Sequence, residues 1–347
     1  MSPLFWQYLL GAEMAPAKAR DFIASLGPRG LDPIAALRTL PSLTEGERRR
    51  LLAVSAEPLE RALEAGVWVA DAPDYPATAF PETLPPALFA WGNPTALTGP
   101  RLAVVGTRRA SAYGRAVAQK FAEGCARRGV GIVSGGAVGI DAAAHRGALA
   151  AHGRTVAVLA GGLDKLYPSA HRGLFQQMRE NGGCLVSQFA VGTPLRDYAF
   201  LIRNGTIAAL SDGVLVVEAP ARSGSLTTAQ EAMEQGKPVF VVPATIDHEG
   251  FRGSHALIRD GALLVDHPGQ IAEVMGWPDP LPEAEPDRPA DDPVTSRILA
   301  ALELEPIALD RIALSTGLDA VELAEALTLL ELDGRVLRDG IGYARVP

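Results

Sequence analysis

The chain is poor in cysteine, lysine and aromatic residues, and it has no long uninterrupted apolar run. Its 347 residues include two cysteines, Cys125 and Cys184, which are far apart and have no metal-ligand spacing. This excludes a disulfide scaffold and a zinc ribbon, and it indicates a reducing compartment. Prolines and glycines interrupt the longest uncharged run, residues 83–100, and the N-terminus lacks the basic start typical of a signal peptide. We therefore expect a cytoplasmic protein that does not cross a membrane.

Several motifs of nucleotide and hydrolytic chemistry are also missing. The sequence has no G-x-x-x-x-G-K-[ST] loop and no G-x-S-x-G elbow, which excludes a P-loop ATPase and disfavours an α/β-hydrolase. No G-x-G-x-x-G follows the first apolar run of the middle segment, so NAD binding is not expected. The six histidines show no spacing that would hold a metal. We expect no catalytic residue, no metal and no cofactor, and hence a binding protein.

Charge is unevenly distributed along the chain. The formal net charge is −8, which argues against bulk binding to nucleic acid. Residues 96–276 nevertheless carry 18 basic and 14 acidic groups, whereas residues 1–95 are net −3 and residues 291–347 are net −6. All but four of the 32 basic residues are arginines. Arginine suits bidentate contacts with phosphate, although a GC-rich genome would give the same bias. The middle segment is therefore the candidate phosphate-binding region.

Seven nearly continuous apolar runs occur within the middle segment. They are residues 101–106, 131–136, 155–162, 184–189, 213–219, 238–244 and 262–265. Strands that are buried on both faces have this pattern, and the intervals between the runs suit one helix each. The pattern predicts an α/β fold with a Rossmann-like, doubly wound parallel sheet.

The remaining segments predict smaller modules on either side of this sheet. We expect a helical domain over residues 1–65, a lead-in segment over 66–100, the Rossmann-like domain over 101–276, a linker over 277–293 and a winged-helix domain over 294–347. The first is similar to SAM and helix-hairpin-helix modules, and the turn at residues 25–30 suits either a plain bundle or a DNA-contacting hairpin. The lead-in segment is rich in proline and is expected to be irregular. The linker holds six prolines and six acids between Pro278 and Pro293.

The winged-helix prediction rests on a pattern of three helices and a hairpin. Helical spacing covers Ser296–Leu304, Ala308–Ser315 and Ala320–Leu332, and two short strands flank Asp339 and Gly340. The third helix carries glutamates and no basic side chain. Its charge is therefore unsuited to a duplex-reading helix.

Candidate anion-binding residues follow the first predicted strand, because doubly wound sheets bind ligands beyond their strand ends. Gly106 and Thr107 lead into Arg108 and Arg109, and Ser111 is placed to cap the next helix. Free N–H groups at that helix start, together with two guanidinium groups, are suited to phosphate. The alternative is that the arginines only solvate a loop.

The second predicted strand ends in a glycine-rich loop. Ser134, Gly135 and Gly136 are expected to expose backbone N–H groups as an anion nest. Asp141 and His145 lie four residues apart on the following helix. They either pair or hold a metal, or they serve only as local caps.

The fourth and fifth predicted strands lead to further candidates. Arg203 and Asn204 are expected near the start of a helix that ends at Ser211, and Phe200 and Tyr198 either stack on bases or join the core. The fifth strand is followed by three small residues at a helix start, Ser223, Gly224 and Ser225. We expect Ser225 to cap that helix, either facing an anion or acting as a cap alone.

Taken together and in order, these strand-end motifs resemble the DNA processing protein A (DprA, also called Smf) family. The matching strings are VVGTRRASAYG (104–114), IVSGGAVGIDAAAH (132–145), VAVLAGGLDKLYP (156–168), RNGTIAALSDGVLVVEA (203–219), SGSLTTAQEAMEQGKPVFVVPA (223–244) and GSHALIRDGALLV (253–265). The resemblance covers about residues 66–275, and six ordered motifs make it specific. Some members of the family also carry a winged-helix domain.

The resemblance implies a homodimeric single-stranded-DNA-binding protein. Such proteins protect incoming DNA in natural transformation and help to load the recombinase RecA onto it. The family pattern places DNA contacts at Gly106, Thr107, Arg108, Ser134, Gly135, Gly136, Arg203 and Asn204.

The sequence departs from the family pattern at three positions. Gly205 stands where the family usually has a second arginine, Ala244 where it has glycine, and His255 where it has asparagine. The loss of an arginine at position 205 suggests that DNA affinity depends more on Arg108, Arg109, Lys165 and Arg172.

A second interpretation is an enzyme. Phosphoribohydrolases of the lysine-decarboxylase-like type are similar in using a glycine-rich loop for a nucleotide phosphate, and they carry P-G-G-x-G-T-x-x-E with a catalytic glutamate. The nearest string here, SGSLTTAQEA, has Glu231 four residues after Thr227 but lacks the P-G-G. The enzyme is therefore the less favoured alternative.

Overall fold

The computed structural model describes most of the chain in two compact units. It covers residues 1–26, 32–71, 85–278, 292–302, 307–332, 335–338 and 342–345. One unit spans Met1–Leu281 and the other spans Pro282–Pro347. Most of the expected hairpin turn at residues 25–30 and most of the linker over 277–293 lie outside the described residues.

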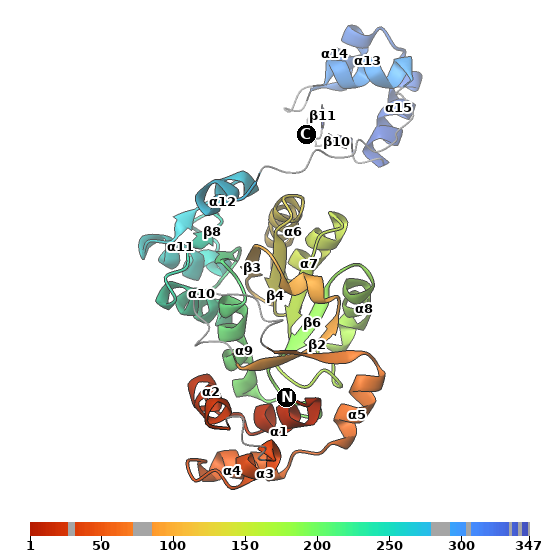
Figure 1. The fold of residues 1–347 in the computed structure, drawn as a ribbon. Helices are drawn as coiled ribbons and strands as arrows, with labels where there is room; N and C mark the ends of the chain where they lie inside the picture. Colours follow the sequence, from red (N-terminus) through yellow and green to blue (C-terminus); the bar gives the residue numbers. More distant parts are fainter. Residues whose placement is uncertain are drawn as a thin grey trace. The chain divides into compact units, whose positions relative to one another are not determined.

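A nine-stranded, mostly parallel sheet forms the centre of the first unit (Figure 1). Its strand order is β1-β2-β6-β5-β4-β3-β7-β8-β9, in which the seven strands from β6 to β9 run parallel. The strands are β1 Val67–Asp71, β2 Ala87–Gly92, β3 Arg101–Val105, β4 Gly131–Ser134, β5 Thr155–Val158, β6 Cys184–Ser187, β7 Gly213–Val216, β8 Val239–Val241 and β9 Leu263–Leu264. All seven apolar runs of the middle segment are strands, so the Rossmann-like α/β prediction is confirmed.

Helices cover both faces of the parallel strands. One face carries α6 Ala112–Ala126, α7 Ile140–Ala150, α8 Arg172–Glu180 and α12 Pro268–Met275. The other carries α9 Asp197–Ala209, α10 Gly224–Glu234 and α11 Arg252–Arg259. Single 3₁₀ turns occur at η1 Pro94–Leu97, η2 Ser169–His171 and η3 Glu249–Phe251.

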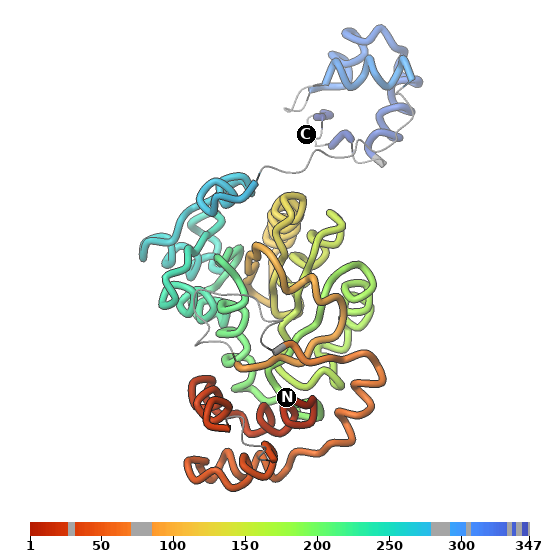
Figure 2. Tube along the Cα trace, in the orientation of Figure 1, coloured from red at the N-terminus to blue at the C-terminus, as the bar shows by residue number. Residues whose placement is uncertain are grey.

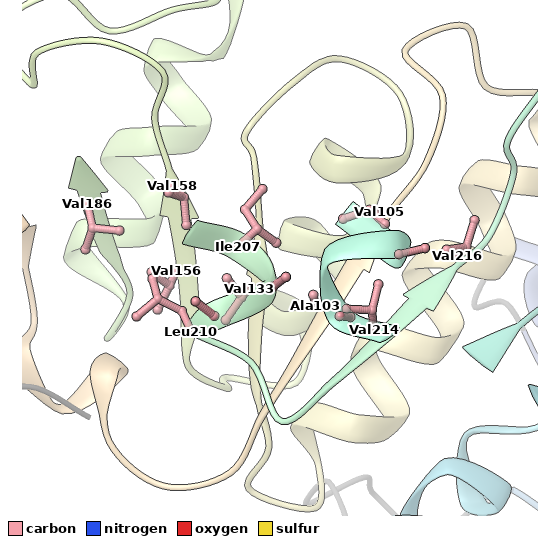
Figure 3. Packing of buried hydrophobic residues seen from close by; sticks show 14 of the residues in the cluster. Ala103, Val105, Val133, Val156, Val158, Val186, Ile207, Leu210, Val214 and Val216 are labelled. Carbon is pink, nitrogen blue, oxygen red and sulfur yellow. The ribbon is translucent and has the colours of Figure 1, made fainter. Parts of the chain in front are cut away.

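Alternating side chains of the strands feed these two layers. On β3, Leu102 and Val104 pack with α6 and α7, whereas Ala103 and Val105 pack with α9 and α10. The second set continues across neighbouring strands, where valines of β4, β5, β6 and β7 meet Ile207 and other residues of α9 (Figure 3). Both faces of each strand are apolar because both are covered, which explains the continuous runs in the sequence.

The lead-in segment is not irregular throughout, as the sequence had suggested. It contributes β1 and β2, which pair antiparallel with each other and extend the sheet beyond β6, again antiparallel. Ala87, Leu88, Phe89 and Ala90 are fully buried in β2. Proline-rich sequence around this short run obscured the strand signal, because proline is rare inside a sheet.

Five helices precede the sheet (Figure 2). They are α1 Pro3–Gly11, α2 Pro16–Ser25, α3 Pro33–Arg38, α4 Glu45–Leu52 and α5 Glu57–Glu64. Side chains of α1, α2 and α5 form a common apolar cluster with β1, β2 and α8. The helical segment is therefore part of the same compact unit as the sheet.

The second unit has its own apolar core. It contains α13 Pro293–Ala301, α14 Leu309–Thr316 and α15 Ala320–Leu332, with an antiparallel pair of strands, β10 Val336–Arg338 and β11 Tyr343–Arg345. This is the expected order of a winged helix, although α13 begins three residues earlier than the sequence indicated. Glu322, Glu325 and Glu331 of α15 are exposed. None of the described helices is long and apolar enough to span a membrane.

Candidate nucleic-acid interface

The chain reverses its direction of winding between β3 and β7, and a groove of about 320 Å³ opens at the carboxyl ends of these strands. Ligands of doubly wound sheets bind at such a switch point. We call it the switch groove; it is lined by residues 105–109, Ala137, Asp141, Phe200, Leu201, Arg203, Asn204, Ile207, Pro220, residues 222–225 and Thr228. Seven of these come from the strand-end candidates Gly106, Thr107, Arg108, Arg109, Ser223, Gly224 and Ser225.

The N-terminus of α6 does not face the switch groove as a free anion site. Ser111 caps this helix as expected, its Oγ accepting from Gly114 N at 2.9 Å. The carboxylate of Glu218, at the end of β7, accepts bonds from Ser111 N at 2.9 Å and Ser111 Oγ at 2.8 Å. Glu218 is 2% exposed. The protein's own carboxylate therefore takes the place that the sequence assigned to a phosphate.

The loop after β3 is tied to the same residue through its backbone. Thr107 N donates to the Glu218 carbonyl at 2.7 Å. A Cβ on Gly106 would lie 2.8 Å from that carbonyl oxygen and 2.5 Å from Ile140, so only glycine allows this approach. Arg108 and Arg109 follow on the exposed part of the loop. Gly106 and Thr107 thus shape the loop, and the two arginines carry the charge.

The glycine-rich loop after β4 is also filled from within. The Asp141 carboxylate accepts from Gly135 N at 3.1 Å and from Ala137 N at 3.3 Å, so these amides do not form an open anion nest. Ser134 is buried and donates to the Val104 carbonyl at 2.7 Å. Gly136 is buried as well, and its carbonyl accepts from His171. Burial raises the pKa of Asp141, whereas Arg203 and the two amides lower it.

Arg203 and Asn204 lie in the middle of α9, not near its start as expected. Arg203 is 5% exposed and donates to the Val158 carbonyl at 3.1 Å. A Cβ on Gly135 would come within 1.5 Å of its guanidinium, which explains the glycine there. Asn204 donates to the Gly224 carbonyl at 3.0 Å and so holds the start of α10. Both residues support the groove from below, each with part of its side chain in the lining.

The N-terminus of α10 opens on the switch groove. Ser223, not Ser225, is the N-cap: its Oγ accepts from Ser225 N at 3.3 Å, and the two hydroxyls are 2.7 Å apart. Gly224 is exposed at the first helical position. Arg222, which the sequence analysis did not select, is exposed beside it. Its place directly after β7 and before the cap was the available signal.

Phe200 separates the switch groove from a second, smaller pocket. The Arg108 guanidinium lies 4.7 Å from the centre of the Phe200 ring, and the Tyr167 ring meets Phe200 edge to face at 6.1 Å. This aromatic pocket of about 90 Å³ is lined by Arg108, Gly135, Ala137, Val138, residues 159–161, Lys165, Tyr167, Pro168, Leu195, Phe200 and Arg203. Lys165 and Tyr167 are exposed at its rim. The two hollows share Arg108 and Phe200 and form one basic, partly aromatic surface.

Several candidates lie elsewhere. Arg172 is exposed at the start of α8 but lines neither hollow. Tyr198 is not a stacking platform of this surface, because its hydroxyl donates to Glu13 at 2.8 Å. Gly205 faces a different cavity, and a Cβ there would lie 3.8 Å from the Glu231 carboxylate. Its replacement of an arginine therefore does not remove a contact from the switch groove.

Asp141 and His145 do not pair with each other. Thr155 Oγ1 donates to Ile132, so the 2.8 Å contact between His145 Nδ1 and this hydroxyl is a bond donated by the histidine. Burial lowers the pKa of His145 to about 3. Among the described residues, no group of three or more histidines, cysteines or acids is placed to hold a metal. The local, structural interpretation of the two residues is the one that the contacts support.

We predict that Glu218→Ala lowers the free energy of unfolding by about 1–3 kcal/mol, because two donors of Ser111 lose their buried acceptor. Urea unfolding, followed by circular dichroism, measures the change. The matched control is Glu273→Ala, since Glu273 is exposed on α12, and it should change stability by less than about 0.5 kcal/mol. Equal midpoints for the two variants would contradict the role given to Glu218.

Comparisons with known proteins agree with this architecture. The sequence model described as DNA recombination-mediator protein A matches residues 66–276, and the one described as DprA winged helix domain matches residues 282–340. The chain is 40% identical over 285 residues to protein Smf of Escherichia coli (strain K12), covering 80% of this chain and 76% of that protein.

Two solved structures are similar to it. The X-ray structure of DNA processing protein A from Streptococcus pneumoniae matches with a TM-score of 0.65 at 29% identity, covering 78% of this chain and 96% of that one. DNA processing protein A from Helicobacter pylori, whose structure concerns its single-stranded DNA binding mode, matches with a TM-score of 0.52 at 29% identity, covering 57% and 92%. With a Rossmann-like unit, a winged helix and these matches, the chain belongs to the DNA recombination-mediator protein A (DprA/Smf) family.

Proposed function

We propose that this protein binds single-stranded DNA along the switch groove and the aromatic pocket. The observation that carries the proposal is the N-terminus of α10, which is capped by a serine hydroxyl and faces three exposed arginines. These are Arg108, Arg109 and Arg222. At the starts of α6 and α7 a carboxylate of the chain bonds to backbone amides, so α10 is the site suited to an incoming phosphate. The relative from Helicobacter pylori supports this ligand.

The aromatic pocket favours a single strand over a duplex. The rings of Phe200 and Tyr167 lie beside Arg108 and Lys165, so bases and phosphates of one strand meet adjacent partners. Stacking on aromatic rings needs unpaired bases and tolerates any sequence. The acidic helix α15, with its exposed glutamates, is unsuited to a major groove.

We further propose the family's physiological role for this chain: protection of single-stranded DNA in the cytoplasm during natural transformation, and delivery of RecA to it, without catalysis by the chain itself. Bound DNA should resist a single-strand nuclease, and the protein should shorten the lag in RecA filament growth. An unchanged lag at saturating protein would contradict the loading role. The enzyme alternative is weakened because Glu231 lines neither the switch groove nor the aromatic pocket.

Self-association is proposed through the β9 edge of the sheet. β9 is the last strand in the sheet order, and its Leu263 and Leu264 are 42% and 52% exposed. An exposed, apolar edge strand favours pairing with another copy. Sedimentation velocity should give twice the mass of the chain at micromolar concentration, and a monomer would contradict the homodimer. In this division of the chain, residues 101–276 bind DNA and carry the dimer edge, and residues 294–347 form a separate module.

We predict that the full chain binds single-stranded oligonucleotides more tightly than duplexes of the same length, with little dependence on base composition. The cause is that backbone and stacking contacts carry little sequence information. Competition titrations by fluorescence anisotropy measure the preference. Equal or tighter binding of the duplex would overturn the proposed function.

We predict that Arg108→Glu weakens binding of single strands about tenfold or more, because one charge-assisted phosphate contact is replaced by repulsion. The slope of log affinity against log salt should become shallower by roughly 0.7. Arg146→Glu is the matched control, since Arg146 is exposed on α7 and lines neither hollow. The same loss in both variants would show a general charge effect and not a contact at Arg108.

A further inference from the structure

A third hollow, of about 440 Å³, lies where the N-terminal helices meet the loop before α9. Three arginines line it, Arg49 and Arg50 from α4 and Arg196 from the loop. Glu13 is the one acid among its described lining residues. We call it the arginine groove. Its net positive charge is not explained by the helix packing around it.

The two sides of the arginine groove are fixed to each other by Gln7 of α1. This amide is fully buried. Its Nε2 donates to the carbonyls of Val191 at 2.7 Å and Ser55 at 3.1 Å, and its Oε1 accepts from Val191 N at 3.0 Å. A buried amide with three bonds holds one geometry, because leaving any of these groups unpaired is costly. The helices therefore present their arginines at a set position beside residues 191–196 (Figure 2).

Glu13 orders the arginines without neutralising all of them. Its backbone has φ 53°, a conformation that is uncommon for a residue other than glycine. Its carboxylate lies 3.8 Å from Arg50 and 3.9 Å from Arg196, and it accepts from Tyr198. Arg49 is 79% exposed, and its pair with Glu45 is at 3.4 Å on the solvent side. Exposed pairs of this kind contribute little, so Arg49 is available to an external anion.

The arginine groove and the aromatic pocket share a wall. Leu195 lines the aromatic pocket, while its neighbours Thr193, Pro194 and Arg196 line the arginine groove. Guanidinium groups therefore lie on both sides of one short loop. An extended polyanion that crosses this loop meets positive charge before and after it.

We propose that the arginine groove is a second phosphate-binding subsite, which takes up the single strand where it leaves the aromatic pocket. This rests on the proposed function. The strand crosses the loop at residues 193–196, and its phosphates contact Arg196 and Arg49, with Arg50 held behind them by Glu13. Arginine suits this role because its fork binds phosphate oxygens in a bidentate manner. The N-terminal helices thereby lengthen the DNA site of the sheet.

The test is a length series of single-stranded oligonucleotides, from about 5 to about 20 nucleotides, bound to the full chain. For Arg49→Ala and Arg196→Ala we expect unchanged affinity for the shortest strands. For the longest strands we expect a loss of about three- to tenfold in each variant, with a salt slope shallower by roughly 0.7. Circular dichroism verifies that each variant is folded.

Arg61→Ala is the matched control. Like Arg49, Arg61 is an exposed arginine of the N-terminal helices in an i,i+4 pair, here with Glu57, but it does not line the groove. Its long-strand affinity should equal that of the unmodified protein. Equal effects of Arg49→Ala and Arg61→Ala, or no effect of either groove variant, would overturn the subsite while Arg108→Glu still weakens binding. Absence of any single-strand binding by the unmodified chain would instead overturn the proposed function.

Discussion

The DNA-facing edge of the sheet depends on one buried carboxylate, that of Glu218. Its side chain bonds to Ser111 at the start of α6, and its backbone carbonyl accepts from Thr107 in the loop after β3. Glu218 follows β7, so these bonds join the two strand ends between which the winding reverses. The exposed loop with Arg108 and Arg109 is held in place by this junction. A charge inside the protein thus positions the charges that face the ligand.

Asp141 does for the glycine-rich loop what Glu218 does for α6. In both places the backbone amides that could hold a phosphate already hold a carboxylate. A glycine-rich strand end followed by a helix is therefore an ambiguous signal, because its anion can come from the ligand or from the chain. At α10 the cap is the neutral hydroxyl of Ser223, and the positive helix end is left for an external anion.

The sequence was sufficient to predict the sheet, its winding and the winged helix, because continuous apolar runs and helical spacing report local burial directly. It was not sufficient for β1 and β2, whose short run is surrounded by prolines. Nor did it place Arg203, since a single arginine in a helix is expected at the surface. Its burial depends on Asp141 and Gly135, which only the folded chain brings next to it. Strand-end position predicted where the site lies, whereas side-chain burial decided which residues can touch a ligand.

The same distinction changes the meaning of the positions that depart from the family pattern. At position 205 an arginine would extend from the side of α9 that faces Glu231 of α10, away from the switch groove. Its natural partner there is a carboxylate of the neighbouring helix, so the glycine alters helix packing and leaves the DNA-facing charge intact. Ala244 and His255 contact each other, because a ring nitrogen of His255 lies 3.2 Å from the Ala244 carbonyl. The charges that face the groove stand on loops and on the start of α10, and there the chain keeps Arg108, Arg109 and Arg222 exposed. An overall charge of −8 is therefore compatible with a polyanionic ligand, since what the strand meets is this local surface.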